Sequence, residues 1–126
     1  MTNQSLQKRE ILRGKLNISE VYFKGTGIRN SPITFLWTKT TIHSDPQIQI
    51  AFSVSKKYHK KAVNRNLLKR RLKEAYRKNK YILHEHIKNQ NIHLKILCIY
   101  SSNKILSYSE LENKIILTLN RLTEDM

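Results

Sequence analysis

The sequence predicts an α+β domain in which a single sheet of about four strands packs with three helices, in the order α-β-β-β-α-β-α. Three observations lead to this class. Apolar and small residues alternate over residues 48–55, residues 62–79 have the apolar spacing of a helix, and a second alternating run covers residues 92–100. The chain has 126 residues, and we expect one domain spanning residues 1–126.

The first predicted helix begins at Asn17 and is short. Glu20 follows three residues later, which is the spacing of a capping box, and the segment Gly25-Thr26-Gly27 ends the helix. Residues 1–15 are basic and lack the apolar run of a signal peptide. We expect them to form a flexible N-terminal segment.

Two or three strands are predicted between the first helix and the basic helix at residues 62–79, and two of them have a clear pattern in the sequence. Residues 33–42 are rich in threonine and aromatic side chains and follow the turn signal Asn30-Ser31-Pro32. A second turn at residues 43–46 leads into the strand 48–55, where large apolar residues alternate with Gln49, Ala51, Ser53 and Ser55. One face of this strand therefore meets the core, and the face with small side chains is open to a ligand.

A helix is predicted at the C-terminus, after the strand at residues 92–100. Ser109 and Glu112 have capping-box spacing. A single helical face then carries Leu111, Ile115, Thr118, Leu119 and Leu122. This apolar face is expected to cover the core.

The charge of the chain points to a polyanionic partner. The 24 Lys and Arg residues outnumber the 9 acids, which gives a formal charge of +15, and twelve of the 24 lie in residues 56–80 beside a single acid, Glu74. A helix this basic repels itself unless a polyanion offsets the charge, so nucleic acid is the first partner to consider. The alternative, a merely solvated charged face, has only Glu74 to pair with ten or more cations.

The predicted helix 62–79 divides into two stripes when its residues are placed about 100° apart. Leu68, Leu72 and Ala75 fall together and are expected to pack on the sheet. The opposite side carries Asn66, Arg70, Lys73 and Arg77, which are expected to face solvent or a polyanion because arginine grips phosphates and asparagine can donate and accept. Lys69 lies at the border between the two stripes.

Other features exclude several classes of protein. Cys98 is a lone cysteine in an apolar run, so no disulfide forms within the chain, which fits a cytoplasmic location, and a buried hydrophobic role is expected for it. No run approaches the roughly 20 apolar residues of a membrane span. The acids form no metal-site motif, and His84 and His86 in His-Glu-His diverge on a helix, so no catalytic or metal-binding residue is assigned.

Residues 52–77, FSVSKKYHKKAVNRNLLKRRLKEAYR, resemble the signature of the bacterial ribonuclease P protein subunit. The resemblance rests on the strand end Phe52-Ser53, the Ser-Lys-Lys step at 55–57, Lys-Ala-Val at 61–63, Arg65-Asn66 and Lys69-Arg70. There are two departures. Leu67 stands where the family has a second arginine, and the loop at 58–60 is one residue longer.

The resemblance implies a ribosomal-protein-like two-layer fold with a left-handed βαβ crossover, an exception to the usual hand. It also implies a subunit of a ribonucleoprotein endonuclease that removes the 5′ leader from precursor tRNA. The expected partners are the catalytic RNA subunit, which uses Mg²⁺, and the single-stranded leader, whereas no cofactor bound by the protein alone, no membrane and no DNA are expected. The residues expected to bind RNA are Lys56, Lys57, Lys60, Lys61, Arg65, Asn66, Lys69, Arg70, Lys73 and Arg77.

A cleft for the leader is expected between the sheet and the basic helix, because single-stranded RNA favours an aromatic platform beside cations. Its expected residues are Tyr22, Phe35, Trp37, Phe52 and Ser53. Two other functions stay open on the sequence. One is a ribosomal-protein-like domain that binds ribosomal RNA, and the other is a DNA-binding helix, which usually comes with a helix-turn-helix partner that the flanking strands do not provide.

Overall fold

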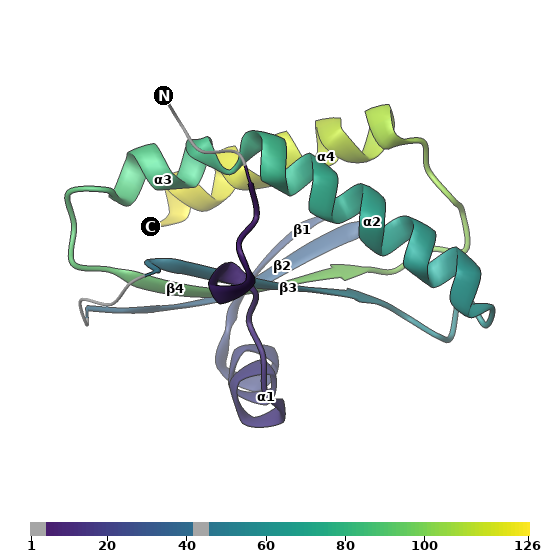
Figure 1. Cartoon of the computed structure of the whole chain (residues 1–126), viewed down its shortest axis with the longest axis horizontal. Coiled ribbons are helices and arrows are strands. Elements are labelled where there is room, and N and C mark those ends of the chain that lie inside the picture. Colours follow the sequence, from purple (N-terminus) through teal and green to yellow (C-terminus); the bar gives the residue numbers. More distant parts are fainter. Residues whose placement is uncertain (1–4, 42–45) are drawn as a thin grey trace.

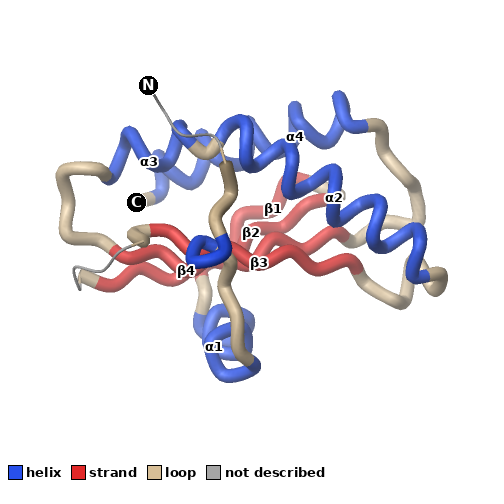
Figure 2. Tube along the Cα trace, viewed as in Figure 1, coloured by secondary structure: helices blue, strands red, loops and turns tan. Residues whose placement is uncertain are grey.

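The computed structural model describes residues 5–41 and 46–126, which form a sheet with helices on both faces (Figures 1 and 2). Residue 42 of the predicted strand 33–42, residues 43–45 of the predicted turn and residues 1–4 lie outside the described residues. In chain order the elements are η1 Lys8–Glu10, α1 Lys15–Lys24, β1 Thr26–Asn30, β2 Ile33–Thr40, β3 Ile48–Val54, α2 Ala62–Asn79, α3 Tyr81–Ile87, β4 His93–Tyr100 and α4 Tyr108–Asp125.

The sheet has the order β1-β2-β4-β3 and is mixed. Strands β1, β2 and β4 pair in antiparallel fashion, whereas β3 and β4 are parallel neighbours, with Ile50 opposite Ile96. The connection between the two parallel strands is the basic helix α2 followed by α3. The α+β class with one sheet is therefore confirmed, while the left-handed sense of the crossover stays a prediction.

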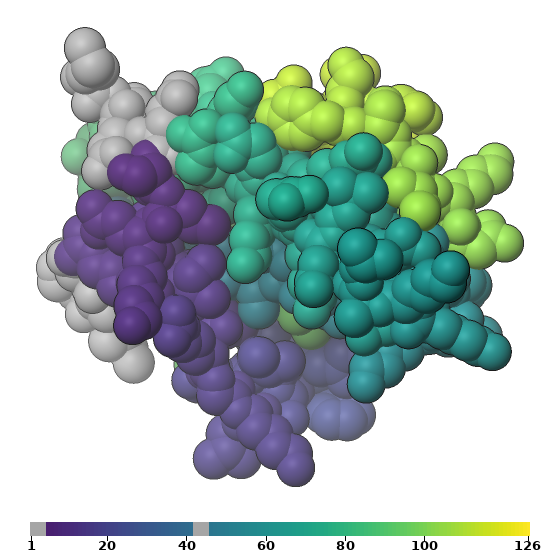
Figure 3. Space-filling view, turned by 45° about the vertical axis from the view of Figure 1, so that its right-hand side comes forward, coloured from purple at the N-terminus to yellow at the C-terminus, as the bar shows by residue number. Residues whose placement is uncertain are grey.

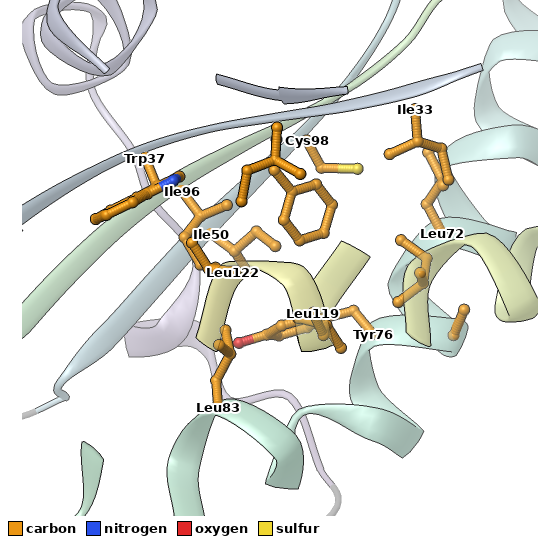
Figure 4. Close-up of a cluster of buried hydrophobic side chains, with 14 of the residues drawn as sticks. Ile33, Trp37, Ile50, Leu72, Tyr76, Leu83, Ile96, Cys98, Leu119 and Leu122 are labelled. Atoms are coloured by element: carbon orange, nitrogen blue, oxygen red, sulfur yellow. The ribbon is translucent and has the colours of Figure 1, made fainter. Parts of the chain in front are cut away.

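The main core lies between the sheet and the layer of α2, α3 and α4 (Figures 1 and 4). Alternate residues of β2, β3 and β4 point into it, including Phe35 and Cys98, which are opposite each other across the β2–β4 ladder. From the helices, Leu72 and Tyr76 of α2 and Leu119 of α4 fill the other side. Burial raises the pKa of the Cys98 thiol, as expected for a cysteine that acts as a small hydrophobic residue.

Two helices begin at different residues than the sequence predicts. Helix α1 begins at Lys15, after Gly14 with φ 93°, and the Asn17 side chain donates to the Arg13 carbonyl oxygen, so the capping box at Asn17 is wrong. Helix α4 begins at Tyr108, because Ser107 rather than Ser109 caps it: the Ser107 hydroxyl accepts from the Glu110 amide and the Glu110 carboxylate reaches back.

The glycine segment at residues 25–27 does more than end the first helix. Gly25 lies against α1 so closely that a Cβ there would collide with the Val21 carbonyl oxygen, and β1 begins at the next residue. Further along, α2 has the predicted bounds of residues 62–79, but the chain continues into α3, which the sequence analysis missed. The part of the chain that the structure describes therefore has four α-helices, one more than the three expected.

The N-terminal residues from 5 to 12 are docked on the domain, which corrects the expectation of a flexible segment over residues 1–15. Ile11 forms a parallel bridge with Ile50 of the edge strand β3, and the Leu12 amide donates to the Ile50 carbonyl oxygen over 2.9 Å. Leu12 is buried in a second cluster with Val21, Ala51 and Leu97, on the α1 face of the sheet. We call residues 5–12 the N-terminal strap.

Candidate nucleic-acid interface

Helix α2 presents a cationic face to solvent and an apolar face to the core, as the helical angles predict. Leu68, Leu72 and Ala75 are fully buried. On the opposite side Asn66, Arg70 and Lys73 are exposed. Lys69, expected at the border, is half-buried, and so is Leu67, the residue at the usual arginine position.

Three arginines of α2 have partners within the protein. The Arg77 guanidinium donates to both carboxylate oxygens of Glu74 over 2.6 and 3.0 Å and thereby lowers the pKa of the Glu74 carboxyl. Arg65 Nη1 donates to the carbonyl oxygens of His59 and Lys60 over 2.9 and 2.8 Å, and Arg71 Nη1 donates to that of Leu106 over 2.6 Å. Arg65 and Arg71 therefore hold neighbouring backbone as well as adding positive charge, whereas Arg77 pairs with the one acid of the helix.

The loop between β3 and α2 carries the four predicted lysines. Lys56, Lys57, Lys60 and Lys61 are all exposed. They extend the cationic face of α2 past the start of the helix, so the structure brings the loop lysines and the exposed residues of the helix onto adjoining surface. We call these four lysines with Asn66, Arg70 and Lys73 the cationic face.

A groove of about 890 Å³ lies on the other face of the sheet, beside α1. The space-filling view shows the surface hollowed between α1 and α2 (Figure 3). Three of the predicted cleft residues, Tyr22, Phe52 and Ser53, line it. The remaining lining residues are mostly aliphatic or hydroxylated, namely Ile18, Thr34, Leu36, Ala51, Ser55, Leu97, Ile99 and Ser101.

Phe52 belongs to the groove and to the core edge at once. Its ring is half-buried and lies 6.1 Å, centroid to centroid, from that of Tyr76 in an edge-on arrangement. Tyr22, by contrast, is 55% exposed at the mouth of the groove and makes an edge-on contact with Phe23. The groove thus has one fixed aromatic wall and one that is accessible from solvent.

Phe35 and Trp37 do not line the groove, which corrects their assignment to the cleft. Phe35 is fully buried and Trp37 is 8% exposed, and both belong to the core cluster beneath the helices. Figure 4 shows Trp37 in this core. Their neighbours Thr34 and Leu36 point to the groove instead. The alternation of β2 was recognised in the sequence, but alternation alone does not say which of its two faces meets the larger helical layer.

The aliphatic floor of the groove, formed by Leu36, Leu97 and Ile99, was not predicted from the sequence. One signal was present: the small residues Ala51 and Ser53 alternate with the core residues of β3 and were expected to leave a face open. The β2 and β4 residues were missed because their side chains are as apolar as those of the core, so only the pairing of the strands separates the two sets.

Together these features define a class of small α+β domains suited to binding RNA. A cationic helix joins two parallel strands on one side of the sheet, and an aliphatic and aromatic groove lies on the other. Among residues 5–41 and 46–126, no helix has the length and apolar character needed to cross a membrane.

The chain belongs to the ribonuclease P protein family, since the family model for ribonuclease P matches residues 6–123. A ribonuclease P protein component from Chlorobium phaeobacteroides is 35% identical over 104 residues, which cover 76% of this chain and 71% of the relative. One from Porphyromonas gingivalis is 27% identical over 117 residues, which cover 93% of this chain and 85% of the relative.

Solved structures show the same fold. The RNase P protein from Thermotoga maritima superposes with a TM-score of 0.70 at 22% identity, covering 90% of this chain and 97% of that one. The Staphylococcus aureus RNase P protein gives a TM-score of 0.64 at 21% identity, covering 90% of this chain and 94% of that one.

Family membership defines the role of the chain. It is a subunit of the ribonuclease P holoenzyme, the endoribonuclease of tRNA 5′ processing, and the family implies an RNA subunit as its partner. The predicted family and the predicted subunit role in tRNA 5′ processing are confirmed, and the alternative of a ribosomal-protein-like domain that binds ribosomal RNA is not favoured.

Proposed function

We propose that the cationic face binds the RNA subunit of ribonuclease P and that the groove holds the single-stranded 5′ leader of precursor tRNA. The observation that carries this proposal is the continuity of β3. Phe52, Ser53 and Ser55 line the groove, and the next two residues, Lys56 and Lys57, open the cationic loop. One strand therefore connects an apolar surface for bases to a charged surface for phosphates.

The groove suits unpaired nucleotides for two physical reasons. Its aliphatic floor and the accessible ring of Tyr22 offer contacts to base faces, which paired bases in a duplex do not expose. The serine hydroxyls of Ser53, Ser55 and Ser101 can both donate and accept, so they match sugar and phosphate oxygens without fixing a sequence.

In this proposal the RNA subunit with its Mg²⁺ ions carries out the chemistry of cleavage. The complex of protein and RNA is located in the cytoplasm. Within the part of the chain that the structure describes, no three His, Cys, Asp or Glu side chains form a group suited to a metal ion. Glu10, the most buried acid among the described residues, is paired with Lys80, and Glu74 is paired with Arg77. The protein contributes positive charge and shape, which lower the repulsion between the two RNAs.

Reconstitution with a bacterial ribonuclease P RNA at low magnesium tests this function. We expect the protein to increase cleavage of precursor tRNA and to bind precursor with a leader of several nucleotides more tightly than mature tRNA. No gain in cleavage together with equal affinity for both tRNAs would contradict the proposal. Crosslinking from a leader nucleotide should recover peptides of β3 or α1, and recovery of α4 peptides alone would count against the groove.

A further inference from the structure

Two loops meet at the end of the sheet where α2 begins (Figure 1). Residues 55–61 connect β3 to α2, and residues 101–107 connect β4 to α4. His59 joins them: its side chain is buried, and its Nε2 atom lies 2.6 Å from the Ser102 carbonyl oxygen. The same ring lies 6.1 Å, centroid to centroid, from that of Tyr100 at the end of β4.

Further hydrogen bonds fix the backbone of both loops. The amides of Tyr58 and His59 donate to the Ser55 carbonyl oxygen, and Arg65 holds the carbonyl oxygens of residues 59 and 60. On the other loop, the Tyr100 hydroxyl donates to the Lys104 carbonyl oxygen over 2.5 Å, and Arg71 donates to the Leu106 carbonyl oxygen. Because Tyr100 of β4 and Arg65 and Arg71 of α2 hold the backbone, the outward side chains are presented from a fixed frame.

The outward side chains of the two loops are one aromatic ring and several lysines around it. Tyr58 is 41% exposed, and the Lys57 ammonium lies 5.6 Å from the centroid of its ring. Lys60 and Lys104 are exposed, and Ile105 beside Lys104 is 43% exposed. Neither loop contains an aspartate or glutamate, so the two loops form a surface of one sign.

We propose that the joined loops 55–61 and 101–107 extend the cationic face into a surface for an unpaired nucleotide. Tyr58 stacks on its base, and Lys57 and Lys60 of the cationic face contact the flanking phosphates together with Lys104. The inference rests on the proposed RNA-binding function and makes it more specific, because it adds an unpaired nucleotide outside the groove. Tyr58 and Lys104 are not among the groove residues, and the groove leaves both side chains unused.

The chemistry favours a single-stranded or bulged nucleotide over a duplex. A charged loop alone binds any phosphate backbone, but an exposed ring gains stacking energy only from a base whose face is free. The Lys57 ammonium is already close to the ring, and a cation beside a stacked base and its phosphate reinforces both contacts.

The test compares Tyr58→Ala and Tyr58→Phe with the wild-type chain and with Tyr81→Ala, a control in which a tyrosine of similar exposure, 45%, is removed from α3. Binding is measured separately to ribonuclease P RNA and to precursor tRNA, and thermal unfolding checks that each variant folds. We expect Tyr58→Ala to weaken binding to at least one RNA by roughly fivefold or more, and Tyr58→Phe to remain near wild type. Tyr81→Ala should match wild type.

The outcomes separate the two proposals. Loss with ribonuclease P RNA alone assigns the surface to the RNA subunit, and loss with precursor tRNA alone assigns it to the substrate; either supports the surface. The proposed surface is overturned if Tyr58→Ala binds both RNAs with wild-type affinity. It is also overturned if Tyr58→Phe loses as much affinity as Tyr58→Ala, because the hydroxyl group rather than the ring would then make the contact. Failure of the wild-type chain to bind either RNA would instead overturn the proposed function.

Lys104→Ala provides a second measurement that does not involve the aromatic ring. If Lys104 contacts a phosphate, the slope of log affinity against log salt should fall by about 0.7–0.9. Arg121→Ala is the matched control, because Arg121 lies on α4 and donates to the Arg29 carbonyl oxygen, away from both loops. An unchanged slope in Lys104→Ala removes the 101–107 loop from the surface.

Discussion

Glu10 and Lys80, which are 70 residues apart in the sequence, form an ion pair of 2.8 Å in which both side chains are almost completely buried. Lys80 also donates to the Ser5 carbonyl oxygen over 2.7 Å, and the second Glu10 oxygen accepts from the Gln7 amide over 2.8 Å. The pair thus attaches the N-terminal strap to the junction of α2 and α3. The strap also pairs with the edge of β3 and contributes Leu12 to the cluster beneath α1, so it connects the two layers of the domain.

Lys80→Ala should lower the free energy of unfolding by about 3–5 kcal/mol, because it leaves the Glu10 carboxylate buried without its partner. The matched control is Lys88→Ala. Lys88 pairs with Glu85 over 3.0 Å, but both side chains are more than half exposed, so the expected loss is at most about 1 kcal/mol. Urea unfolding measures both variants. Similar losses in the two would show that burial of the Glu10–Lys80 pair has no special role.

The double change Glu10→Leu with Lys80→Met extends this comparison. Removing both charges leaves no unpaired ion, so much of the lost stability should return. A double variant as unstable as Lys80→Ala would indicate that the hydrogen bonds to residues 5 and 7, rather than the buried charges, hold the strap.

Stability should fall with acidification because of His84. Burial, followed by the nearby Lys80 ammonium, lowers the pKa of His84 below its ordinary value. The unfolded chain therefore binds the proton more readily than the folded one. Stability is lost as the pH falls through the unfolded pKa of about 6.5 toward the lower folded pKa.

His84→Gln should flatten this part of the stability curve, measured by urea unfolding between about pH 7.5 and about pH 5.5. His86→Gln, which changes an exposed histidine of the same helix, is the control and should keep the wild-type slope. Identical slopes in the wild type and His84→Gln would assign the acid sensitivity elsewhere, for instance to His93, whose pKa burial also lowers.

Arg65→Ala should loosen the loop before α2. Removing the guanidinium leaves the carbonyl oxygens of His59 and Lys60 without their side-chain donor, so Lys57, Lys60 and Lys61 become better substrates for trypsin. Limited proteolysis with mass spectrometry measures cleavage at each lysine. Arg70→Ala removes a cation of the same helix that no such bond restrains, and it should leave the cleavage rate unchanged. Equal protection in both variants would contradict a positioning role for Arg65.

Arg70 and Lys73 are the α2 residues best placed to contact phosphates, because both are exposed on the cationic face. Arg70→Ala and Lys73→Ala should each lower the salt slope of binding to ribonuclease P RNA by about 0.7–0.9. Lys69→Ala tests the half-buried border position in the same way. Arg121→Ala serves as the control, and a slope that only this control changes would move the RNA contact from α2 to α4.

Substitutions of Phe35 and Tyr22 should have different effects, one on the stability of the fold and the other on leader binding. Phe35→Ala removes a fully buried ring from the core and should cost about 3–5 kcal/mol of unfolding free energy, with leader affinity kept under conditions where the variant is folded. Tyr22→Ala removes a ring that is 55% exposed at the groove. It should leave the unfolding free energy nearly unchanged and weaken the affinity for the leader. The difference in affinity between precursor and mature tRNA reports leader binding. The groove assignment fails if Tyr22→Ala keeps that difference in full.

Much of the fold could be predicted because local periodicity depends only on neighbouring residues. The alternation in β3 and the apolar stripe Leu68, Leu72 and Ala75 in α2 were assigned correctly for this reason. Helix starts were less predictable. Ser107 and Ser109 both precede a glutamate by three residues, and only the path of the chain leaving β4 decides that Ser107 is the cap. The position of the strap could not be predicted, because Lys80 at the junction of α2 and α3 pairs with Glu10, which is remote in sequence.

The sequence by itself determined the α+β class, the basic helix and its family, because charge density and the motif at residues 52–77 are properties of one continuous segment. Only the tertiary structure decided which side of the sheet each strand residue faces, and so placed Phe35 and Trp37 in the core and Leu36 in the groove. It also decided how the cations are used. Arg65 and Arg71 hold loop carbonyl oxygens whereas Arg70 and Lys73 face solvent, since the hydrogen-bond partners of a side chain are set by which loops the fold brings beside it.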